Sequence, residues 1–322
     1  MTFKLREALL NHLSKLKTRV IIDLVFKAGT SSIHVGAPEL TIEPLRRLFR
    51  VRMGNKDEFI VPSSSIKGAF RSLSEKIAKS MKNLPDLSQV EKLAIELHRE
   101  DPKKMGLLTH DSDDPRALTM LKELDVGAEE MVALGIPSTE AEEIVSSLSK
   151  SKPDDNAKRL MDLAFPLYCP ICKLYGAPSL AGKLKFYDCF TMGDHEVHFT
   201  HHAGISRSTL VSQEDILYTL EECIALGGLK TTIIADNVTP GETDAKLLAL
   251  TLDAILKLGL HIGARKSVGL GHINVNEEQT KCWLIDFTAQ AGTQQKIALL
   301  TQPRQAQPTT IKDLIQRLKS QQ

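Results

Sequence analysis

Two stretches of this 322-residue sequence concentrate side chains that bind anions or metal ions. The first, VPSSSIKGAFRS, places three serines after a proline and sets Lys67 and Arg71 one helical turn apart. A helix N-terminus already carries partial positive charge, so cations there gain nothing from the fold unless an anion lies in front of them. The pattern favours a phosphate site built from backbone N–H groups, the hydroxyls of Ser64 and Ser65, and the two cations. An ordinary capped surface helix is the alternative.

The second stretch, CPIC, gives Cys169 and Cys172 the spacing of paired metal ligands. Structural zinc takes four ligands, and the sequence contains no second C-x-x-C. His98 and His110, which lie in ELHRED and LTHDSD, are the candidates to complete the set. The pattern therefore predicts a structural zinc site, with two reduced, partly buried thiols as the alternative.

A third stretch, ARKSVGLGH, combines two cations with two glycines. Arg265 and Lys266 can neutralise phosphate, while Gly269 and Gly271 permit positive φ angles and a close approach of the backbone. These glycines lead into a strand and do not open a helix, so the stretch is not a dinucleotide-binding fingerprint. We expect it, together with Ser267, to bind a phosphate backbone.

The elements that position these residues follow from the hydrophobic periodicity. Strand-like and helical patterns occur in the order β, α, helical region, β, β, α, β, which predicts an α+β fold with a ferredoxin-like sheet and two helices on one face. A serine of the 63–65 run is expected to cap the first of these helices. A capping box from Thr239 to Glu242 is expected to open the second.

The region from 79 to 165 shows helix signals, such as the capping-box pattern from Ser88 to Glu91, without an intervening strand, and we interpret it as an α-helical insertion. The chain is therefore divided into a first part of the core (1–78), the insertion (79–165), a second part of the core (166–275) with a hairpin, and a C-terminal extension (276–322).

The composition sets limits on partners and compartment. The sequence is 42% hydrophobic and 25% charged with a net charge of +1, so any positive charge that meets nucleic acid must be local. No apolar run approaches membrane-spanning length, so no membrane partner is expected. Five cysteines, two of them in CPIC, suit a reducing cytoplasm better than a disulfide framework.

Together, the three motifs resemble those of the RAMP superfamily of CRISPR interference proteins, above all the repeated backbone subunit of type III effector complexes. That family carries the patterns I-P-G-S-S-[LI]-K-G-x-x-R, C-x-x-C-[KR]-[LI]-[FY]-G and G-x-x-[KR]-S-x-G-x-G. The sequence matches nearly all of these positions between Lys17 and Val275, with Ser63 where the family has glycine. The resemblance implies a ferredoxin-like (RRM-related) domain that binds guide RNA and stacks with copies or paralogues of itself.

The resemblance also implies an RNA-contacting hairpin. The stretch HFTHHAGISRSTL leads into the counterpart of the family's thumb, which inserts into the guide–target duplex, and Arg207 matches a basic position there. The expected RNA-binding residues are then His34, Gly36, Ser64, Ser65, Lys67, Arg71, Arg207, Arg265, Lys266, Ser267, Gly269 and Gly271.

The sequence departs from the family pattern at the catalytic loop. Relatives that cut target RNA carry an aspartate between the glycine after the first strand and the I-P-G-S-S motif. The nearest acidic residues here are Glu43 and, second, Glu39. A carboxylate in this loop could hold a divalent cation such as magnesium or act as a base, but glutamate is one methylene longer than aspartate. Two roles for Glu43 therefore stay open: a catalytic carboxylate and a charged loop residue without a catalytic role.

Three functions compete at this point. The leading one is a guide-RNA-binding backbone subunit of a type III CRISPR interference complex, with target-RNA cleavage left open. The second is a non-catalytic structural or capping paralogue. The third is a stand-alone RNA-processing nuclease, which would need a histidine acid–base pair near the glycine-rich stretch, for example His34 and His272. The expected partners are guide RNA, complementary target RNA, other effector subunits, and copies or paralogues of the chain.

Overall fold

The structure is a computed structural model that describes residues 12, 15–27, 31–36, 45–81, 87–99, 110–111, 114–123, 127–133, 136–148, 155–205, 208, 212–288 and 293–320. It contains helices and mainly antiparallel sheets, so the α+β class is confirmed. Among the described residues, no helix is long and apolar enough to cross a membrane.

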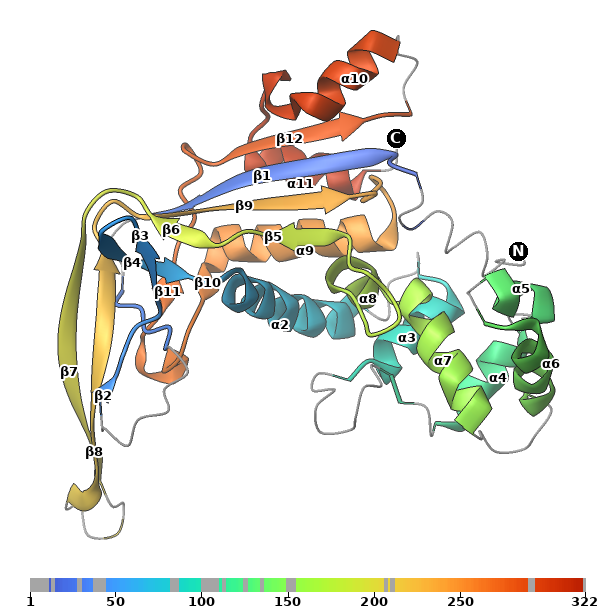
Figure 1. The fold of residues 1–322 in the computed structure, drawn as a ribbon, viewed down its shortest axis with the longest axis horizontal. Helices are drawn as coiled ribbons and strands as arrows, with labels where there is room; N and C mark the ends of the chain where they lie inside the picture. The colour runs from blue at the N-terminus through green and yellow to red at the C-terminus, as the bar shows by residue number, and fades with distance from the viewer. Residues whose placement is uncertain are drawn as a thin grey trace.

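The main sheet is centred on β1 and β9 (Figure 1). Its strands lie in the order β12-β1-β9-β6-β4-β3, and β5 also pairs with β9. Their bounds are Thr18–Phe26 (β1), Arg50–Met53 (β3), Lys56–Val61 (β4), Leu184–Phe186 (β5), Cys189–Thr191 (β6), Leu229–Asp236 (β9) and Lys281–Asp286 (β12). Alternate residues of β1, such as Val20 and Leu24, enter the main core, while Ile21 packs on the opposite face beside Trp283.

Two helices, α2 (Ser63–Met81) and α9 (Thr243–Leu258), lie on the same face of this sheet (Figure 1). The predicted start of the second helix is wrong, because Thr239 to Glu242 precede it and Glu242 makes no side-chain cap bond. Its first turn instead carries the fully buried Asp244, whose Oδ2 accepts from Lys183 Nζ at 2.6 Å. This buried ion pair joins α9 to the residue that precedes β5.

The opposite face of the sheet is partly covered by α10 (Thr293–Thr301), and α11 (Ile311–Lys319) packs against α9 (Figure 1). Trp283 Nε1 donates to the carbonyl of Ala306 at 2.9 Å and so ties β12 to this C-terminal segment.

The region between α2 and β5 is mainly helical where the structure describes it, apart from turns, caps and the bridge between His98 and His110. Its helices are α3 (Gln89–Leu97), α4 (Pro115–Glu123), α5 (Ala128–Ala133), α6 (Ser138–Ser147), α7 (Asp155–Tyr168) and α8 (Pro170–Tyr175). The capping box from Ser88 to Glu91 forms as the sequence predicts. These helices lie beyond the end of the sheet, on the side away from the hairpin (Figure 1).

A long hairpin of β7 (His195–Ile205) and β8 (Ser212–Ala225) projects from the other end of the molecule (Figure 1). The short β2 (Leu45–Arg46) pairs with β8 in parallel. Near the base of the hairpin, β10 (Leu260–His261) and β11 (His272–Ile273) pair on either side of a turn that contains the short 3-10 helix η2 (Lys266–Val268).

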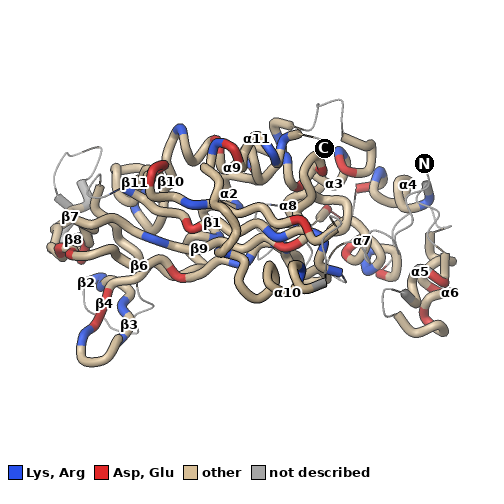
Figure 2. The backbone as a smooth tube through the Cα atoms, turned by 90° about the horizontal axis from the view of Figure 1, so that it is seen from above, with Lys and Arg blue, Asp and Glu red and all other residues tan. Residues whose placement is uncertain are grey.

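Charges of both signs are interspersed along the chain (Figure 2), in keeping with the net charge of +1. Any site for a polyanion must therefore be local.

Candidate functional site

The structure brings the four predicted metal ligands together. Ligand atoms of His98, His110, Cys169 and Cys172 all lie within 4.8 Å of one another, and all four residues are buried. Cys169 is the N-cap of α8 and Cys172 lies within it, so one short helix presents both thiols. His98 follows α3 and forms an antiparallel bridge with His110, which aligns the two imidazoles. We call these four residues the metal cluster.

The contacts of His98 orient it as a ligand. Its Nδ1 lies 3.6 Å from each of the two sulfurs, and its Nε2 lies 3.2 Å from Oε1 of Glu75 on α2. A carboxylate on the far nitrogen is the usual outer partner of a metal-binding histidine, because it fixes which nitrogen carries the proton. The donor set of two sulfurs and two nitrogens, and the partner of His98, therefore fit a transition metal.

The electrostatics of the cluster favour deprotonated sulfur. Burial lowers the pKa of His98, but the charge of Cys169 and the hydrogen bonds to Cys169 and Glu75 outweigh it and raise this pKa to about 9. Burial raises the pKa of the Cys169 thiol, yet the hydrogen bond with Cys172 and the charge of His98 bring it well below its ordinary value. Thiolate is the form that binds metals.

The N-terminus of α2 is capped by a carboxylate and not by a serine, so that part of the sequence prediction is wrong. The carbonyl of Pro62 accepts the first helical bonds, from Ser65 N–H at 2.9 Å and Ile66 N–H at 3.3 Å. The Ser63 N–H donates to Oδ1 of Asp188 at 2.7 Å. Since Asp188 already occupies the end of the helix, a further anion would bind one turn along, beside Lys67 and Arg71.

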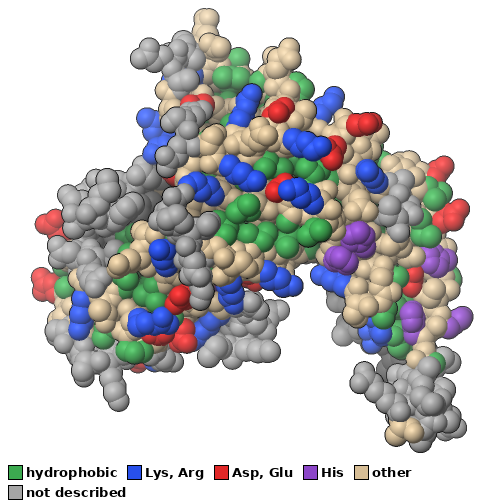
Figure 3. All heavy atoms as spheres, turned by 180° about the vertical axis from the view of Figure 1, so that it is seen from behind, with side chains coloured by type: hydrophobic (Ala, Val, Ile, Leu, Met, Phe, Trp, Pro, Cys, Tyr) green, Lys and Arg blue, Asp and Glu red, His purple; other side chains and the backbone are tan. Residues whose placement is uncertain are grey.

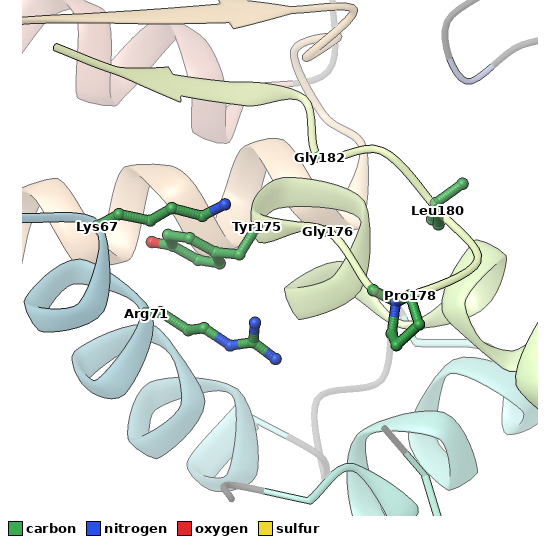
Figure 4. A pocket seen from close by; sticks show the side chains of 8 residues that line it. Lys67, Arg71, Tyr175, Gly176, Pro178, Leu180 and Gly182 are labelled. Carbon is green, nitrogen blue, oxygen red and sulfur yellow. The ribbon is translucent and has the colours of Figure 1, made fainter. Parts of the chain in front are cut away.

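A pocket of about 370 Å³ opens at that place. It is lined by Lys67, Arg71, Tyr175, Gly176, Ala177, Pro178, Leu180 and Gly182, and Figure 4 shows the two cations reaching from α2 towards the loop after α8. We call it the phosphate pocket. Gly182 is required there because a Cβ would lie 2.6 Å from the backbone carbon of Tyr175. Partial burial, and then the charge of Arg71, lower the pKa of Lys67.

Arg71 is held by one end of its guanidinium. Its Nε donates to Oε1 of Glu75 at 2.9 Å, one helical turn along α2. Its Nη2 is shielded from solvent and has no hydrogen-bond partner among the described residues. An unsatisfied buried donor is costly, and a phosphate oxygen would satisfy it if the side chain of Arg71 turned this nitrogen towards the pocket.

The second predicted phosphate site, residues 263–271, is an exposed turn, which we call the glycine-rich turn. Gly263 adopts φ 73°, Arg265 φ 60°, Gly269 φ 93° and Gly271 φ 73°, so the backbone is left-handed at four points. A Cβ on Gly271 would collide with the carbonyl of Ile262, whereas nothing lies within 4 Å of one on Gly269. The side chains of Lys266 and Ser267 face solvent.

The glycine-rich turn contacts the β7–β8 hairpin through an aromatic ring. The guanidinium of Arg265 lies 4.6 Å from the centre of the Tyr218 ring, and that of Arg46 lies 5.4 Å from it. His202 stacks on the same ring, with 5.3 Å between centres. Seen from behind, histidine side chains gather on the side of the molecule that carries the hairpin (Figure 3). Cations and stacked rings at one place suit nucleic acid.

Two further predicted residues have structural contacts. His34 is buried, and its Nδ1 lies 2.8 Å from the carbonyl oxygen of Glu221 on β8. A Cβ on Gly36 would lie 3.2 Å from Nε2 of His34. The side chain of His34 thus holds the hairpin and does not face solvent. Ser64 is exposed and Ser65 half-buried.

Three predicted residues lie outside the described part of the chain: Glu39, Glu43 and Arg207. The catalytic role of the two glutamates and the RNA contact of Arg207 stay predictions.

Sequence reasoning missed Glu75, Tyr218 and Arg46. The spacing of Arg71 and Glu75, four residues apart on a helix, could have indicated their ion pair. The contact of Glu75 with His98 joins separate elements and has no local signal.

Comparison with known proteins identifies the family of the chain. A solved structure described as a "Type IV-B CRISPR Complex" aligns with a TM-score of 0.39 and 14% identity, over 85% of this chain and 93% of that chain. None of the curated proteins matches the chain. The family model of the RAMP superfamily matches residues 27–274, which include the metal cluster, the phosphate pocket and the glycine-rich turn. The chain therefore belongs to the RAMP superfamily.

Proposed function

We propose that the chain is a guide-RNA-binding backbone subunit of a CRISPR interference complex of type III character. The observation that carries the proposal is the phosphate pocket, which two cations of α2, Lys67 and Arg71, line together. The glycine-rich turn would supply a second backbone contact through Arg265 and Lys266. A complementary target RNA, further effector subunits, and copies or paralogues of the chain would then be its partners.

The proposal includes a ferredoxin-like core. Its support is the sheet, in which β1 lies between β9 and β12, with α2 and α9 on one face. The bridge from Phe26 to Val275 places the chain after β11 beside the end of β1. We propose the division at 78, 165 and 275 as well, because the elements described between α2 and α8 are helices.

We propose zinc for the metal cluster. Two thiolates and two imidazoles are a common closed set for structural zinc, and burial leaves little room for a substrate. Zinc would there hold the insertion against the second part of the core, because His98 and His110 come from the first and both cysteines from the second.

RNA cleavage by this subunit is proposed only as weak or absent activity. It would need Glu43 or Glu39 to hold a cation such as magnesium, and glutamate stands where the family has aspartate. A non-catalytic backbone or capping paralogue satisfies the same observations of the pocket and the turn.

One observation favours the nuclease alternative. His261 and His272 are register partners at the two ends of the glycine-rich turn, with ring centres 4.7 Å apart. Burial, followed by the charges of His272 and Lys266, lowers the pKa of His261, which leaves it neutral and able to accept a proton. The side chain of His34 is buried against the carbonyl of Glu221, so His261 replaces it in this reading. Cleavage of single-stranded RNA in EDTA that is lost in His261→Ala would support the nuclease; no cleavage would exclude it.

The main proposal is tested by RNA binding of the full chain. A variant with alanine at Lys67, Arg71, Arg265 and Lys266 should bind a labelled single-stranded RNA at least tenfold more weakly. The slope of log affinity against log salt should fall by about 0.7 for each lost contact.

The matched control removes four exposed cations outside both sites: Arg116, Arg159, Lys257 and Lys312. It changes the net charge equally. Equal weakening in the two variants would show that RNA responds only to net charge, and the proposal would be wrong.

A further inference from the structure

One carboxylate oxygen, Oε1 of Glu75, contacts both a residue of the phosphate pocket and a residue of the metal cluster. Glu75 is buried, and its Oε1 lies 2.9 Å from Arg71 Nε and 3.2 Å from His98 Nε2. A buried carboxylate is stable only when paired, and here one partner belongs to the pocket and the other to the cluster. Among the described residues, Arg71 and His98 are the side chains that bond to Glu75.

A bound metal would fix one end of this chain of contacts. His98 would coordinate through Nδ1, which faces both sulfurs, and its Nε2 would then carry the proton and donate to Glu75. Without the metal, His98 keeps its contacts with Glu75, His110 and the two sulfurs, but no coordinate bond holds its Nδ1. The position of His98, and through it that of Glu75, is then less firmly fixed.

The other end of the chain of contacts lies in the pocket. With Nε on Glu75, the guanidinium of Arg71 is held at one end, and the residue lines the pocket beside Lys67 (Figure 4). An arginine that is already oriented loses less rotamer entropy when it binds phosphate than a free one.

The pocket wall opposite α2 is tied to the same cluster. Gly176 N–H donates to the carbonyl of Cys172 at 2.8 Å, so the loop that lines the pocket begins one turn after a ligand. Tyr175 OH, on that wall, lies 2.7 Å from Ser74 Oγ of α2. Both walls therefore rest on residues that the metal would hold.

We infer that Glu75 is a positioning residue through which metal binding and RNA binding favour each other. The RNA half of this inference rests on the proposed function, whereas the metal half rests on the cluster alone. Coupling between two sites is reciprocal, so RNA must raise the affinity for metal by the same factor by which metal raises the affinity for RNA.

The experiment measures two affinities of the full chain. Binding of a labelled single-stranded RNA is followed by fluorescence anisotropy with and without zinc, and zinc binding by competition with a coloured chelator with and without RNA. The parent should bind RNA about tenfold more tightly with zinc, and zinc about tenfold more tightly with RNA, a coupling within the usual range.

Three variants separate the contributions. Glu75→Gln should bind zinc about ten- to a hundredfold more weakly and, at saturating zinc, bind RNA more weakly than the parent. Arg71→Gln should lose RNA affinity and its zinc dependence but keep its zinc affinity. Glu140→Gln removes an exposed carboxylate 2.9 Å from Arg159 and should behave as the parent.

Each result decides a separate statement. RNA binding that is equal in the zinc-loaded parent and in zinc-loaded Glu75→Gln would overturn the coupling and leave the proposed function standing. No RNA binding by any form would refute the proposed function, and the zinc affinity of Glu75→Gln would then decide the metal half, with an unchanged value overturning it. Thermal melting identifies a variant that does not fold; if Glu75→Gln is one, unchanged zinc dependence in Arg71→Gln overturns the coupling.

Discussion

The two candidate phosphate sites combine the same residue types in opposite settings. Lys67 and Arg71 lie half-buried in a pocket, and Arg71 is held by Glu75. Lys266 lies on an exposed turn whose shape depends on glycines with positive φ. The pocket can therefore form oriented hydrogen bonds at fixed positions, whereas the turn mainly adds positive charge that salt screens. Equal numbers of cations need not contribute equally to RNA binding.

The largest effect should follow loss of the metal cluster. Of the two candidate phosphate sites, the pocket is the one that contacts this cluster, through Glu75. Cys169→Ser with Cys172→Ser should abolish zinc binding and lower the melting temperature by about 10 °C or more, because metal binding energy is part of the folding energy. Elemental analysis and thermal melting check this. Cys189→Ser, at a buried thiol outside the cluster, is the control and should keep its zinc. Zinc retained by the double variant would contradict the assignment.

The next effect tests the backbone of the turn. Gly271→Ala should destabilise the fold by about 3 kcal/mol, since it adds a collision with the Ile262 carbonyl to an unfavourable φ. Gly269→Ala shares the positive φ but meets no neighbour, so its cost should be about 1–2 kcal/mol. Urea unfolding of the pair measures the difference. Equal costs would mean that the turn is not held by the packing described.

The third prediction compares the two sites directly. Arg71→Ala should weaken RNA binding by about 2 kcal/mol, roughly 30-fold, because it removes a charged hydrogen bond from an ordered donor. Lys266→Ala should cost less than about 1 kcal/mol, as an exposed charge. Anisotropy titrations at one salt concentration decide this. If the two losses are equal, the distinction between pocket and turn is wrong.

Substitution of Gly68 by alanine should have a smaller effect, and it should raise the stability of the protein while it lowers the affinity for RNA. It is exposed in the middle of α2, and a Cβ there would meet nothing within 4 Å. Gly68→Ala should therefore stabilise the protein by up to about 1 kcal/mol. If RNA approaches the helix beside Lys67, the same methyl group should weaken RNA binding. A variant that is more stable and binds RNA as before would place the RNA elsewhere.

The smallest effect concerns pH. Lysine binds phosphate only while protonated, and burial, together with Arg71, lowers the pKa of Lys67. As pH rises, the pocket should lose this charge before an exposed lysine loses its own, so RNA affinity should begin to fall at a lower pH than for a surface lysine. Lys67→Arg, which stays charged, should remove that early fall. The measurement uses 2′-O-methyl RNA between pH 8 and 10, since it resists alkaline hydrolysis.

Local signals predicted most elements of the fold. Apolar spacing located β1 and α2, the Ser88 capping box located α3, and Gly259 ends α9 as expected. The start of α9 was misplaced because Thr239, Pro240 and Glu242 imitate a helix start, while the fold begins the helix at Thr243, where Asp244 meets Lys183. A buried ion pair between distant residues outweighed the local pattern.

The candidate sites were predictable as residue types and not as contacts. The spacing of CPIC and the serine-lysine-arginine stretch each identified one side of a site. The partner residues of each site come from elsewhere in the chain. Asp188 caps α2, Glu75 contacts His98, and the guanidinium of Arg265 lies over the ring of Tyr218. Such contacts depend on how separate elements pack, and the hydrophobic periodicity of the sequence does not predict them.

The place of β1 in the sheet has a consequence for how the chain acquires its structure. The strand pairs with β9 and β12. Thr18 is therefore the register partner of Asp286, although the two residues lie near opposite ends of the sequence. Ribosomes add about 5–20 residues per second, so β1 waits between about 10 and 50 s for its last partner. Pairing of such distant segments makes folding slow, and the apolar face of β1 stays uncovered until β9 and α9 have been made. The early chain is therefore most exposed to aggregation before its second half is synthesised.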